Sequence, residues 1–496
     1  MRAKKALINT VMAILREIVV VICNFILPRL ILSHYGSTYN GLISSIEQFL
    51  TYGNLMQFGI AGATRAALYK PISENNLDSI STIYITTRKF MHKLSCFFVL
   101  LVFIMICIYP YLFIDKFDWF FTASLVMILG INALAINFLG ISYKAILAAD
   151  QRQYLITGSQ IACVIISTVT SVMLIDNGAD IRLVKLVAAL SFCLQPFLLK
   201  YAVDKSFKID YAAKPDNKII GQRWDAFAHQ MATFAHDNTD VVILTLFLDL
   251  KEISVYAIYR MVVNGVKAII NSLGSGIEAA FGNMIARKQK ESLNAAFKMF
   301  EITLFYLSGI VFSCAIVLIL PFVDVYTKGV TDVDYQRPLF GLLFCIAELL
   351  WCIRIPYQVV TQAAGHYKQT RNGAIIEPII NIIISLCLVN IMGMNGVIVG
   401  TIIAMTYRTI QYSLYSTAHV LERKYNLFLY RIIVLIMQML LSCFVSRFFV
   451  LEVKSYFSFF ELALGRGVII AVVSMFVAVL FDRKYLKSVL AYYQKR

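Results

Sequence analysis

Runs of about twenty apolar residues recur from one end of the chain to the other, and a helix of that length crosses the hydrocarbon core of a bilayer. Only 15% of the 496 residues are charged, whereas ordinary soluble domains contain roughly 25%. The runs are continuous and do not alternate in polarity, which disfavours a membrane β-barrel. We therefore expect an all-α polytopic membrane protein, and we interpret the first run as an uncleaved anchor.

Fourteen membrane spans are predicted, and the distribution of positive charge supports their number. With both chain termini in the cytoplasm, the inside segments hold 30 Lys and Arg residues and the outside loops hold seven. Such an excess on the cytoplasmic side orients helical membrane proteins. The net charge of +16 is then explained by topology and by attraction to anionic lipids, not by nucleic-acid binding. The predicted spans are 6–33, 39–61, 92–114, 119–143, 154–175, 182–201, 225–248, 253–285, 296–321, 337–360, 372–392, 395–419, 428–450 and 461–481.

A charged connector after the sixth span divides the chain near its middle. Six spans lie on each side of it and both sets begin in the cytoplasm, as in transporters built from parallel repeats. The stretch ILAADQRQY before span five also resembles TQAAGHYKQ before span eleven. We expect two six-helix lobes around a central cavity, with two extra helices at the C-terminus. The predicted parts are an N-lobe (1–201), the cytoplasmic connector (202–224), a C-lobe (225–425), and spans thirteen and fourteen with a cytoplasmic tail (426–496).

Span eight carries a polar stripe that points to a water-filled cavity. Its members are Arg260, Asn264, Lys267, Asn271 and Glu278, spaced 4, 3, 4 and 7 residues apart. On one helix they fall within a stripe roughly 60° wide. Because charges are costly in lipid, the stripe is predicted to line a cavity that binds substrate.

Four other arginines within the spans, Arg16, Arg29, Arg354 and Arg408, are further candidates for substrate binding. A bend at Pro28 would bring Arg16 and Arg29 toward one cavity. Two alternatives remain open: Arg29 snorkels outward, and Arg16 pairs with Glu47 or Glu278.

Acidic residues in the spans are candidates for ion coupling or for charge balance. They are Glu47, Asp237, Asp240 and Glu278. Asp237 and Asp240 are three residues apart and share a helix face, with His236 adjacent. His229 and His236 are about 10 Å apart along a helix, so a metal site is disfavoured. We expect no cofactor, and no G-x-x-x-x-G-K-[ST] stretch is present to bind a nucleotide.

The segment FILPRLILSHYGSTYNGLISSIEQFLTYGNLMQFGIAGATRAALYKP (25–71) resembles the start of bacterial polysaccharide-unit (Wzx-type) flippases. These belong to the multidrug/oligosaccharidyl-lipid/polysaccharide exporter superfamily. The resemblance implies a non-enzymatic flippase in the bacterial cytoplasmic membrane that moves an undecaprenyl-pyrophosphate-linked oligosaccharide to the outer leaflet. It also implies membrane lipids, a polysaccharide polymerase and chain-length proteins as partners in capsule, O-antigen or exopolysaccharide synthesis. Pyrophosphate needs Arg or Lys donors, which the spans provide.

Two other functions remain open. One is a proton- or sodium-coupled multidrug exporter of the same superfamily. Such an exporter would favour a carboxylate-rich lumen for organic cations, and the cations Arg260 and Lys267 disfavour this interpretation. A membrane polysaccharide polymerase would need catalytic carboxylates in an external loop, where Asp324, Asp332 and Asp334 are available.

Overall fold

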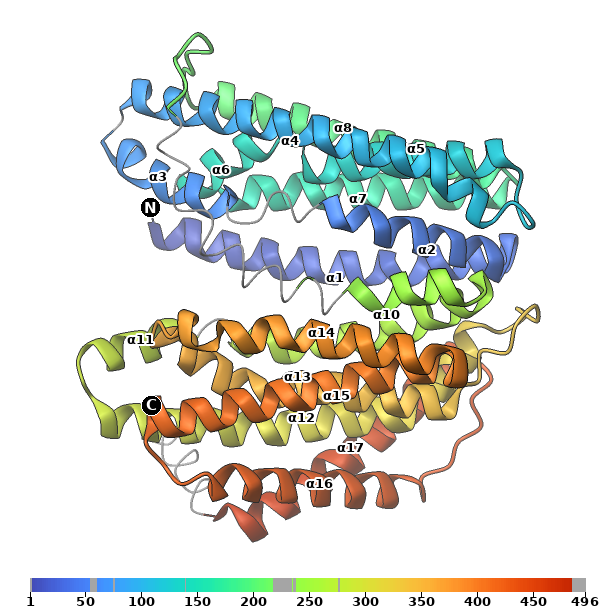
Figure 1. Cartoon of the computed structure of the whole chain (residues 1–496), viewed down its shortest axis with the longest axis vertical. Coiled ribbons are helices and arrows are strands. Elements are labelled where there is room, and N and C mark those ends of the chain that lie inside the picture. The colour runs from blue at the N-terminus through green and yellow to red at the C-terminus, as the bar shows by residue number, and fades with distance from the viewer. Residues whose placement is uncertain are drawn as a thin grey trace. The chain divides into compact units, whose positions relative to one another are not determined.

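A computed structural model describes residues 2–53, 60–74, 76–138, 140–216, 234, 238–274 and 277–483. The regular elements of these segments are all helices, and the chain divides into two compact units, Met1–Phe234 and Ala235–Arg496 (Figure 1). Eleven of the described helices are long and apolar enough to cross a membrane. They coincide with eleven of the predicted spans, so the prediction of an all-α polytopic membrane protein is confirmed.

The three other predicted spans, which are spans two, seven and twelve, are not among these eleven helices. Span two begins as a helix that ends at Thr51, and span seven contains the short apolar helix Asn238–Phe247. Span twelve is a 23-residue helix, Met394–Ser416.

The first unit combines long helices with two short ones at one end. Its helices are α1 (Arg2–Tyr35), α2 (Ser37–Thr51), α3 (Ile60–Ser73), α4 (Leu77–Leu112), α5 (Trp119–Asn137), α6 (Ile141–Ala149), α7 (Gln153–Asp176) and α8 (Ile181–Asp204). Buried apolar side chains of α3, α4, α6 and α8 form one core, which includes Leu68, Tyr84, Ile146 and Leu199. This core fixes the two short helices against the ends of the long ones.

The described part of the predicted connector packs on the first unit. The backbone NH of Asp210 donates to Ser81 Oγ of α4 at 3.0 Å. The Tyr211 ring lies edge-on to Tyr84, with their centroids 5.9 Å apart, and Arg88 lies over the Tyr211 ring. Residues 205–216 are therefore held by α4.

The second unit contains the remaining helices. They are α10 (Leu250–Gly274), α11 (Glu278–Ala286), α12 (Lys290–Tyr326), α13 (Pro338–Ala363), α14 (Tyr367–Met392), α15 (Met394–Ser416), the π-helix η3 (Thr417–Leu421), α16 (Asn426–Ser446) and α17 (Tyr456–Phe481). Helices α13, α14 and α15 pack together, while α16 and α17 pack on α12. The prediction of one helix over 253–285 is wrong, because α10 ends at Gly274 and α11 begins at Glu278.

The α12–α16 contact depends on one glycine and one buried amide. Gln438 of α16 donates to the carbonyl of Tyr306 at 3.1 Å and to Ser474 Oγ of α17 at 2.9 Å. A Cβ atom on Gly309 would lie 2.6 Å from the Gln438 amide, so glycine makes room for it. The amide thus joins three helices at one level.

A buried ion pair closes the segment after α15. Arg423 Nη1 donates to Glu301 Oε2 of α12 at 2.9 Å, and Tyr357 of α13 donates to the same carboxylate, which is 1% exposed. Burial opposes the charge on Arg423, but hydrogen bonds with Glu301 outweigh it and raise the pKa of the guanidinium. This pair holds η3 and its flanking residues against α12 and α13.

Connections predicted to lie on the same side of the membrane gather at one end of each unit. In the first unit, Asn9 Nδ2 of α1 donates to the carbonyl of Gln151 at 3.0 Å, and at the other end the Tyr35 hydroxyl donates to the carbonyl of Ala179. In the second unit, Asn294 donates to the carbonyl of Leu421 at one end, and Lys251 donates to that of Asp332 at the other. This grouping agrees with the predicted alternation of inside and outside loops.

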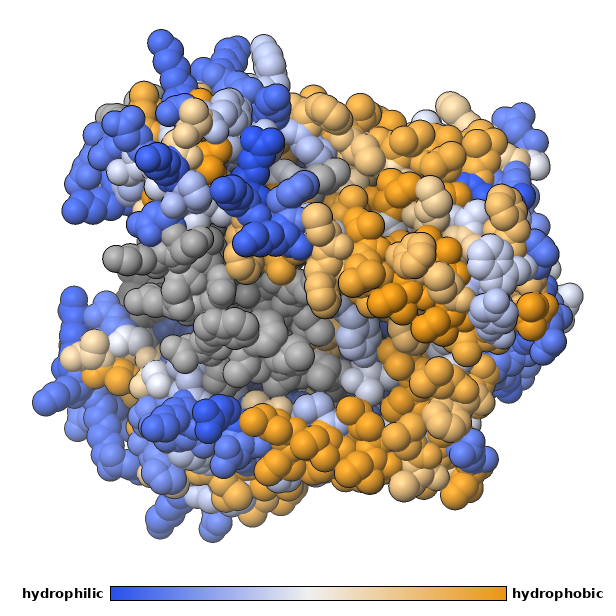
Figure 2. All heavy atoms as spheres, turned by 45° about the horizontal axis from the view of Figure 1, so that its top comes forward, coloured by the Kyte–Doolittle hydropathy of each residue, from blue (hydrophilic) through white to orange (hydrophobic). Residues whose placement is uncertain are grey.

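The exposed faces of the long helices are apolar. Phe97 and Phe103 of α4 and Leu440 and Phe444 of α16 are among the exposed side chains. On the face shown in Figure 2, apolar side chains cover the middle of the helices and hydrophilic ones gather toward their ends. This is the distribution expected of helices surrounded by lipid.

The two similar sequence stretches form the same turn in the two units. In the first, the NH groups of Gln151 and Arg152 donate to the carbonyls of Ala148 and Leu147. In the second, the NH groups of Gly365 and His366 donate in the same pattern, to Gln362 and Thr361. The backbone is left-handed at both corners, with φ 60° at Gln151 and 73° at Gly365. Helices commonly end in this turn, and the same hydrogen-bond pattern occurs at Gly178 and Lys288. The internal repeat therefore stays a prediction.

The left-handed corner at Gly365 gives a stability prediction. Gly365→Ala should lower the free energy of unfolding by about 1 kcal/mol, because a Cβ disfavours this conformation although no atom lies within 4 Å of it. Gly265→Ala is the matched control, since Gly265 has equal space within a helix and its replacement should be neutral or stabilising. Denaturant unfolding in micelles measures both, and equal effects would contradict the prediction.

Candidate functional site

A buried charge cluster joins α13, α14 and α15. Arg354 Nη1 donates to Glu377 Oε1 at 2.9 Å, and Arg408 Nε lies 3.4 Å from Glu377 Oε2. All three side chains are at most 6% exposed. Arg408 also donates to the Thr370 carbonyl at 3.0 Å and to the Tyr412 hydroxyl at 2.9 Å. One carboxylate therefore holds two arginines.

Trp351 links this cluster to α10. Lys267 Nζ lies 3.0 Å from Glu348 Oε2 and 4.2 Å from the centroid of the Trp351 ring. The guanidinium carbon of Arg354 is also 4.2 Å from that centroid, so the ring accepts two cation–π contacts. Trp351 Nε1 donates to Asn271 Oδ1 at 3.2 Å. Lys267 and Arg354 are thus held around one indole ring.

Helical spacing explains how the sequence builds this network. Lys267 and Asn271 are four residues apart on α10, and Glu348, Trp351 and Arg354 follow at intervals of three on α13. Residues three or four apart share a helix face, so each helix presents its polar members to its neighbours. We call Lys267, Asn271, Glu348, Trp351, Arg354, Glu377 and Arg408 the basic network.

The basic network contains three cations and two carboxylates, so it carries one excess positive charge. Buried charges are tolerated only when they are paired and hydrogen-bonded, as Arg354, Glu377 and Arg408 are. An anion with several oxygen acceptors could replace a carboxylate as the partner of these arginines. The arrangement is therefore chemically able to bind a phosphate-bearing group.

A second buried polar cluster surrounds Asp240. The hydroxyl of Thr401 on α15 donates to its carboxylate at 3.0 Å, and the hydroxyl of Tyr256 on α10 donates at 3.3 Å. Asn381 Nδ2 on α14 donates to Asp240 at 3.4 Å, and Ser385 Oγ donates to Asn381 Oδ1 at 2.9 Å. This site offers carboxylate, hydroxyl and amide oxygens, which are hard ligands for a small cation. A protonated carboxyl group would fit the same site.

Three predicted site residues lie in the first unit. Arg16 forms an ion pair with its neighbour Glu17. Glu47 Oε1 lies 3.1 Å from Nζ of Lys185, which belongs to α8. Arg29 is half-buried, and α1 continues through Pro28. The structure therefore gives Arg16 and Glu47 oppositely charged partners within the first unit.

The remaining members of the predicted stripe are not brought into the basic network. Arg260 is half-buried and Asn264 is exposed, although both lie on α10 with Lys267. Glu278 is half-buried at the first position of α11, so it does not continue the α10 stripe along one helix. Asp237 and the predicted His229 and His236 lie outside the described residues.

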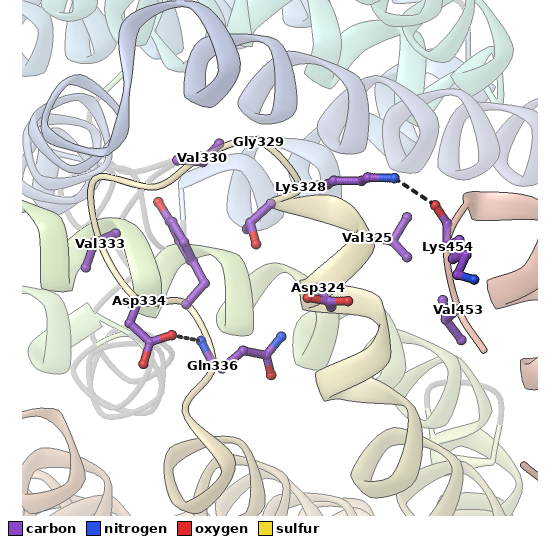
Figure 3. Close-up of a pocket in the computed structure, with 12 residues that line it drawn as sticks. Asp324, Val325, Lys328, Gly329, Val330, Val333, Asp334, Gln336, Val453 and Lys454 are labelled. Carbon is purple, nitrogen blue, oxygen red and sulfur yellow. Dashed lines mark hydrogen bonds between the residues drawn. The ribbon is translucent and has the colours of Figure 1, made fainter. Parts of the chain in front are cut away.

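A pocket of about 470 Å³ opens at the end of the second unit where the α12–α13 and α16–α17 connections meet (Figure 3). Its lining includes Asp324 from the last turn of α12, Asp334 from the α12–α13 loop and Lys454 from the α16–α17 loop. Lys328 Nζ donates to the Lys454 carbonyl at 3.1 Å and so joins the two loops. Asp334 accepts from the Gln336 backbone NH at 2.8 Å. Two of the three carboxylates considered for a polymerase thus lie in one pocket, where Asp334 already caps a turn.

Several residues of these clusters were not predicted as site residues, although Glu348 and Glu377 are visible as acids within apolar runs. Glu377, Asn381 and Ser385 occur every fourth residue on α14, a spacing that marks one helix face. That pattern was available in the sequence, whereas the contacts of Trp351 required knowledge of how α10 packs on α13. Within the described segments, no group of three His, Cys, Asp or Glu side chains has the arrangement of a metal site.

Comparison with solved structures shows which known proteins share this fold. No protein-family model matches the chain, and no curated protein matches it by sequence. Among solved structures, lipid II flippase MurJ in an inward closed conformation superposes with a TM-score of 0.73 at 14% identity, over 97% of this chain and 100% of MurJ. An inward-facing multidrug resistance MATE transporter of the MOP superfamily gives 0.66 at 11% identity, over 80% of this chain and 94% of that one. The MATE multidrug transporter DinF-BH gives 0.58 at 14% identity, over 85% and 95%. The chain therefore has the fold of MOP-superfamily transporters.

Proposed function

We propose that this multi-pass membrane protein is a flippase for a lipid-linked oligosaccharide, carried on undecaprenyl pyrophosphate, in a bacterial cytoplasmic membrane. The observation that carries the proposal is the basic network, in which Lys267 pairs with Glu348, while Arg354 and Arg408 share Glu377. Pyrophosphate is the part of such a substrate that most needs cationic donors as it crosses the membrane. The fold shared with a lipid II flippase adds support.

In the proposed cycle, the cations of the basic network exchange their carboxylate partners for the phosphate oxygens of the substrate, and then exchange them back. When the substrate headgroup enters, its phosphate oxygens take the place of Glu348 beside Lys267, or of Glu377 beside Arg354. The headgroup leaves on the outer side when the carboxylate pairs re-form. Because the carboxylates compete with phosphate, binding is weak enough for release. Arg16, Arg29, Arg260 and Asn264 are proposed to contact the headgroup or sugars along the way.

Energy for net movement is proposed to come from an ion gradient acting at Asp240. Its carboxylate is held by Thr401, Tyr256 and Asn381, all of which are neutral. A sodium ion or proton at this position would change the local charge on helices α14 and α15, which also carry Glu377 and Arg408. Ion binding could thus alter the strength of the Glu377 pairs. Glu47, Glu278 and Asp237 are proposed as charge-balancing residues.

Exchanging the two charges of the Lys267–Glu348 ion pair tests whether Lys267 acts in transport or only stabilises the fold. Lys267→Glu combined with Glu348→Lys preserves an ion pair at 3.0 Å but moves the cation from α10 to α13. We expect this double variant to keep its fold and to lose at least about tenfold in flipping rate, because one misplaced charge-assisted contact with phosphate is worth about 1.5–3 kcal/mol.

The measurement uses proteoliposomes that contain a fluorescent undecaprenyl-pyrophosphate oligosaccharide. Lys267→Arg keeps the cation in place and should retain activity. A wild-type rate in the exchanged variant would assign Lys267 to structure alone. Transport of an organic dye cation, with no flipping of the lipid-linked sugar, would support the multidrug-exporter alternative instead.

A further inference from the structure

A second basic site lies at the end of the second unit where the predicted inside loops gather. A pocket of about 300 Å³ is bordered by three connections: the α11–α12 turn, the α13–α14 turn and the π-helix η3. The first contributes the basic side chains of Lys288 and Lys290, the second His366 and the third His419. Three segments far apart in the sequence therefore supply basic groups to one pocket.

The other side of the pocket is apolar. Ile285 of α11, Leu293 of α12 and Val420 of η3 line it, and Leu293 is 4% exposed. A small inorganic anion needs only the basic side chains, whereas an amphiphile with an anionic head would also use these apolar ones. The lining therefore favours a ligand that combines negative charge with hydrocarbon.

The two histidines are fixed in orientation by Tyr415. Its hydroxyl is 3.0 Å from His366 Nδ1, and its ring stacks on His419 with centroids 4.6 Å apart. His419 Nδ1 lies 3.2 Å from the Tyr415 carbonyl. Because Nδ1 of each ring is occupied, Nε2 of each is the atom left to contact a ligand. His419 Nδ1 donates to a carbonyl, so Nε2 of His419 donates to a phosphate when the ring is protonated.

The backbone around the pocket is unusual. The π-helix η3 interrupts the end of α15, and π-helical turns occur frequently at functional sites. Lys288 has φ 57° and Glu422 has φ 49°, a left-handed conformation that non-glycine residues seldom adopt. Lys290, which also lines the pocket, pairs with Glu422. No ion pair of the Lys288 side chain occurs among the described residues.

The pocket lies where membrane-spanning helices begin. Helices α12 and α14 start at Lys290 and Tyr367, and both are long and apolar enough to cross a membrane. This level corresponds to the headgroup layer, where basic pockets between helices bind anionic lipids. We propose that the pocket binds an anionic phospholipid, with its phosphate at Lys288, His366 and His419 and its glycerol and upper acyl chain on Ile285, Leu293 and Val420.

The test measures lipid retention by the full-length protein. Native mass spectrometry after exchange into phosphatidylglycerol or phosphatidylcholine gives the lipids bound to each protein. Lys288→Gln should weaken retention of phosphatidylglycerol about fivefold, the effect expected for one lysine near a membrane surface. Glutamine fits this backbone, since Gln151 occupies the same kind of turn at φ 60°. Lys454→Gln is the matched control, because it removes one lysine at the opposite end of the unit and should leave retention unchanged.

Three outcomes would overturn the proposal. Equal retention of phosphatidylglycerol by Lys288→Gln and wild type would remove the pocket as the binding site. Equal retention of phosphatidylcholine and phosphatidylglycerol by the wild type would remove the role of headgroup charge. Displacement of the lipid by millimolar inorganic phosphate would identify a small-anion site. The flipping assay is separate, so lipid binding can fail while flippase activity stands, and the reverse.

Discussion

Glu377→Gln is expected to lower the free energy of unfolding by about 3–5 kcal/mol, because it leaves Arg354 and Arg408 buried together without a counter-charge. Glutamine keeps the shape of the side chain and removes only the charge. Both guanidinium groups are less than 5% exposed, so water cannot replace the carboxylate. Equilibrium unfolding in mixed micelles would measure the change.

An exposed ion pair provides the control for Glu377→Gln. Glu452 Oε2 lies 2.6 Å from Lys454 Nζ, but both side chains are about 80% exposed. Glu452→Gln therefore breaks an ion pair by the same chemical change and should cost at most about 1 kcal/mol. If the two variants lose the same stability, the buried network does not contribute as described.

Asp240→Asn is expected to abolish the gradient dependence of flipping. In wild-type proteoliposomes, one coupled charge at 100 mV provides about 2.3 kcal/mol, which permits up to about fiftyfold accumulation. The Asn variant keeps the hydrogen-bonding partners Thr401 and Asn381 but has no carboxylate to bind a proton or sodium ion. It should flip lipid-linked oligosaccharide at one rate, whichever gradient is imposed.

Thr401 supplies the companion variants for this experiment. Thr401→Ser retains the hydroxyl that donates to Asp240 at 3.0 Å and should retain gradient dependence. Thr401→Val removes it and should weaken the dependence. If Asp240→Asn responds to sodium and proton gradients as strongly as the wild type does, coupling occurs elsewhere, and Glu47 and Glu278 become the next residues to replace.

The long spans could be predicted because length and hydropathy are local properties of the sequence. The end of α10 at Gly274 coincides with the sequence Gly-Ser-Gly (274–276), a local signal for a helix end that an average of hydropathy over a whole span does not weigh. The prediction of one continuous stripe from Arg260 to Glu278 failed for that reason.

The candidate site was predictable only in part. Lys267, Arg354 and Arg408 stand out because each is a charge within an apolar run, and the structure gathers them. Their partners depend on the rotation of each helix against its neighbour. The sequence could not indicate that Arg16 pairs with the adjacent Glu17, since a cavity and a neighbouring acid satisfy the same charge.

The Gln438 amide between α12, α16 and α17 bears on what the last two helices contribute to this architecture. Without α16 and α17, Gly309 and the neighbouring Tyr306 carbonyl would face lipid, with no amide to occupy the notch. These two helices are therefore part of the packing of α12, and a chain truncated after α15 should be less stable than the full chain.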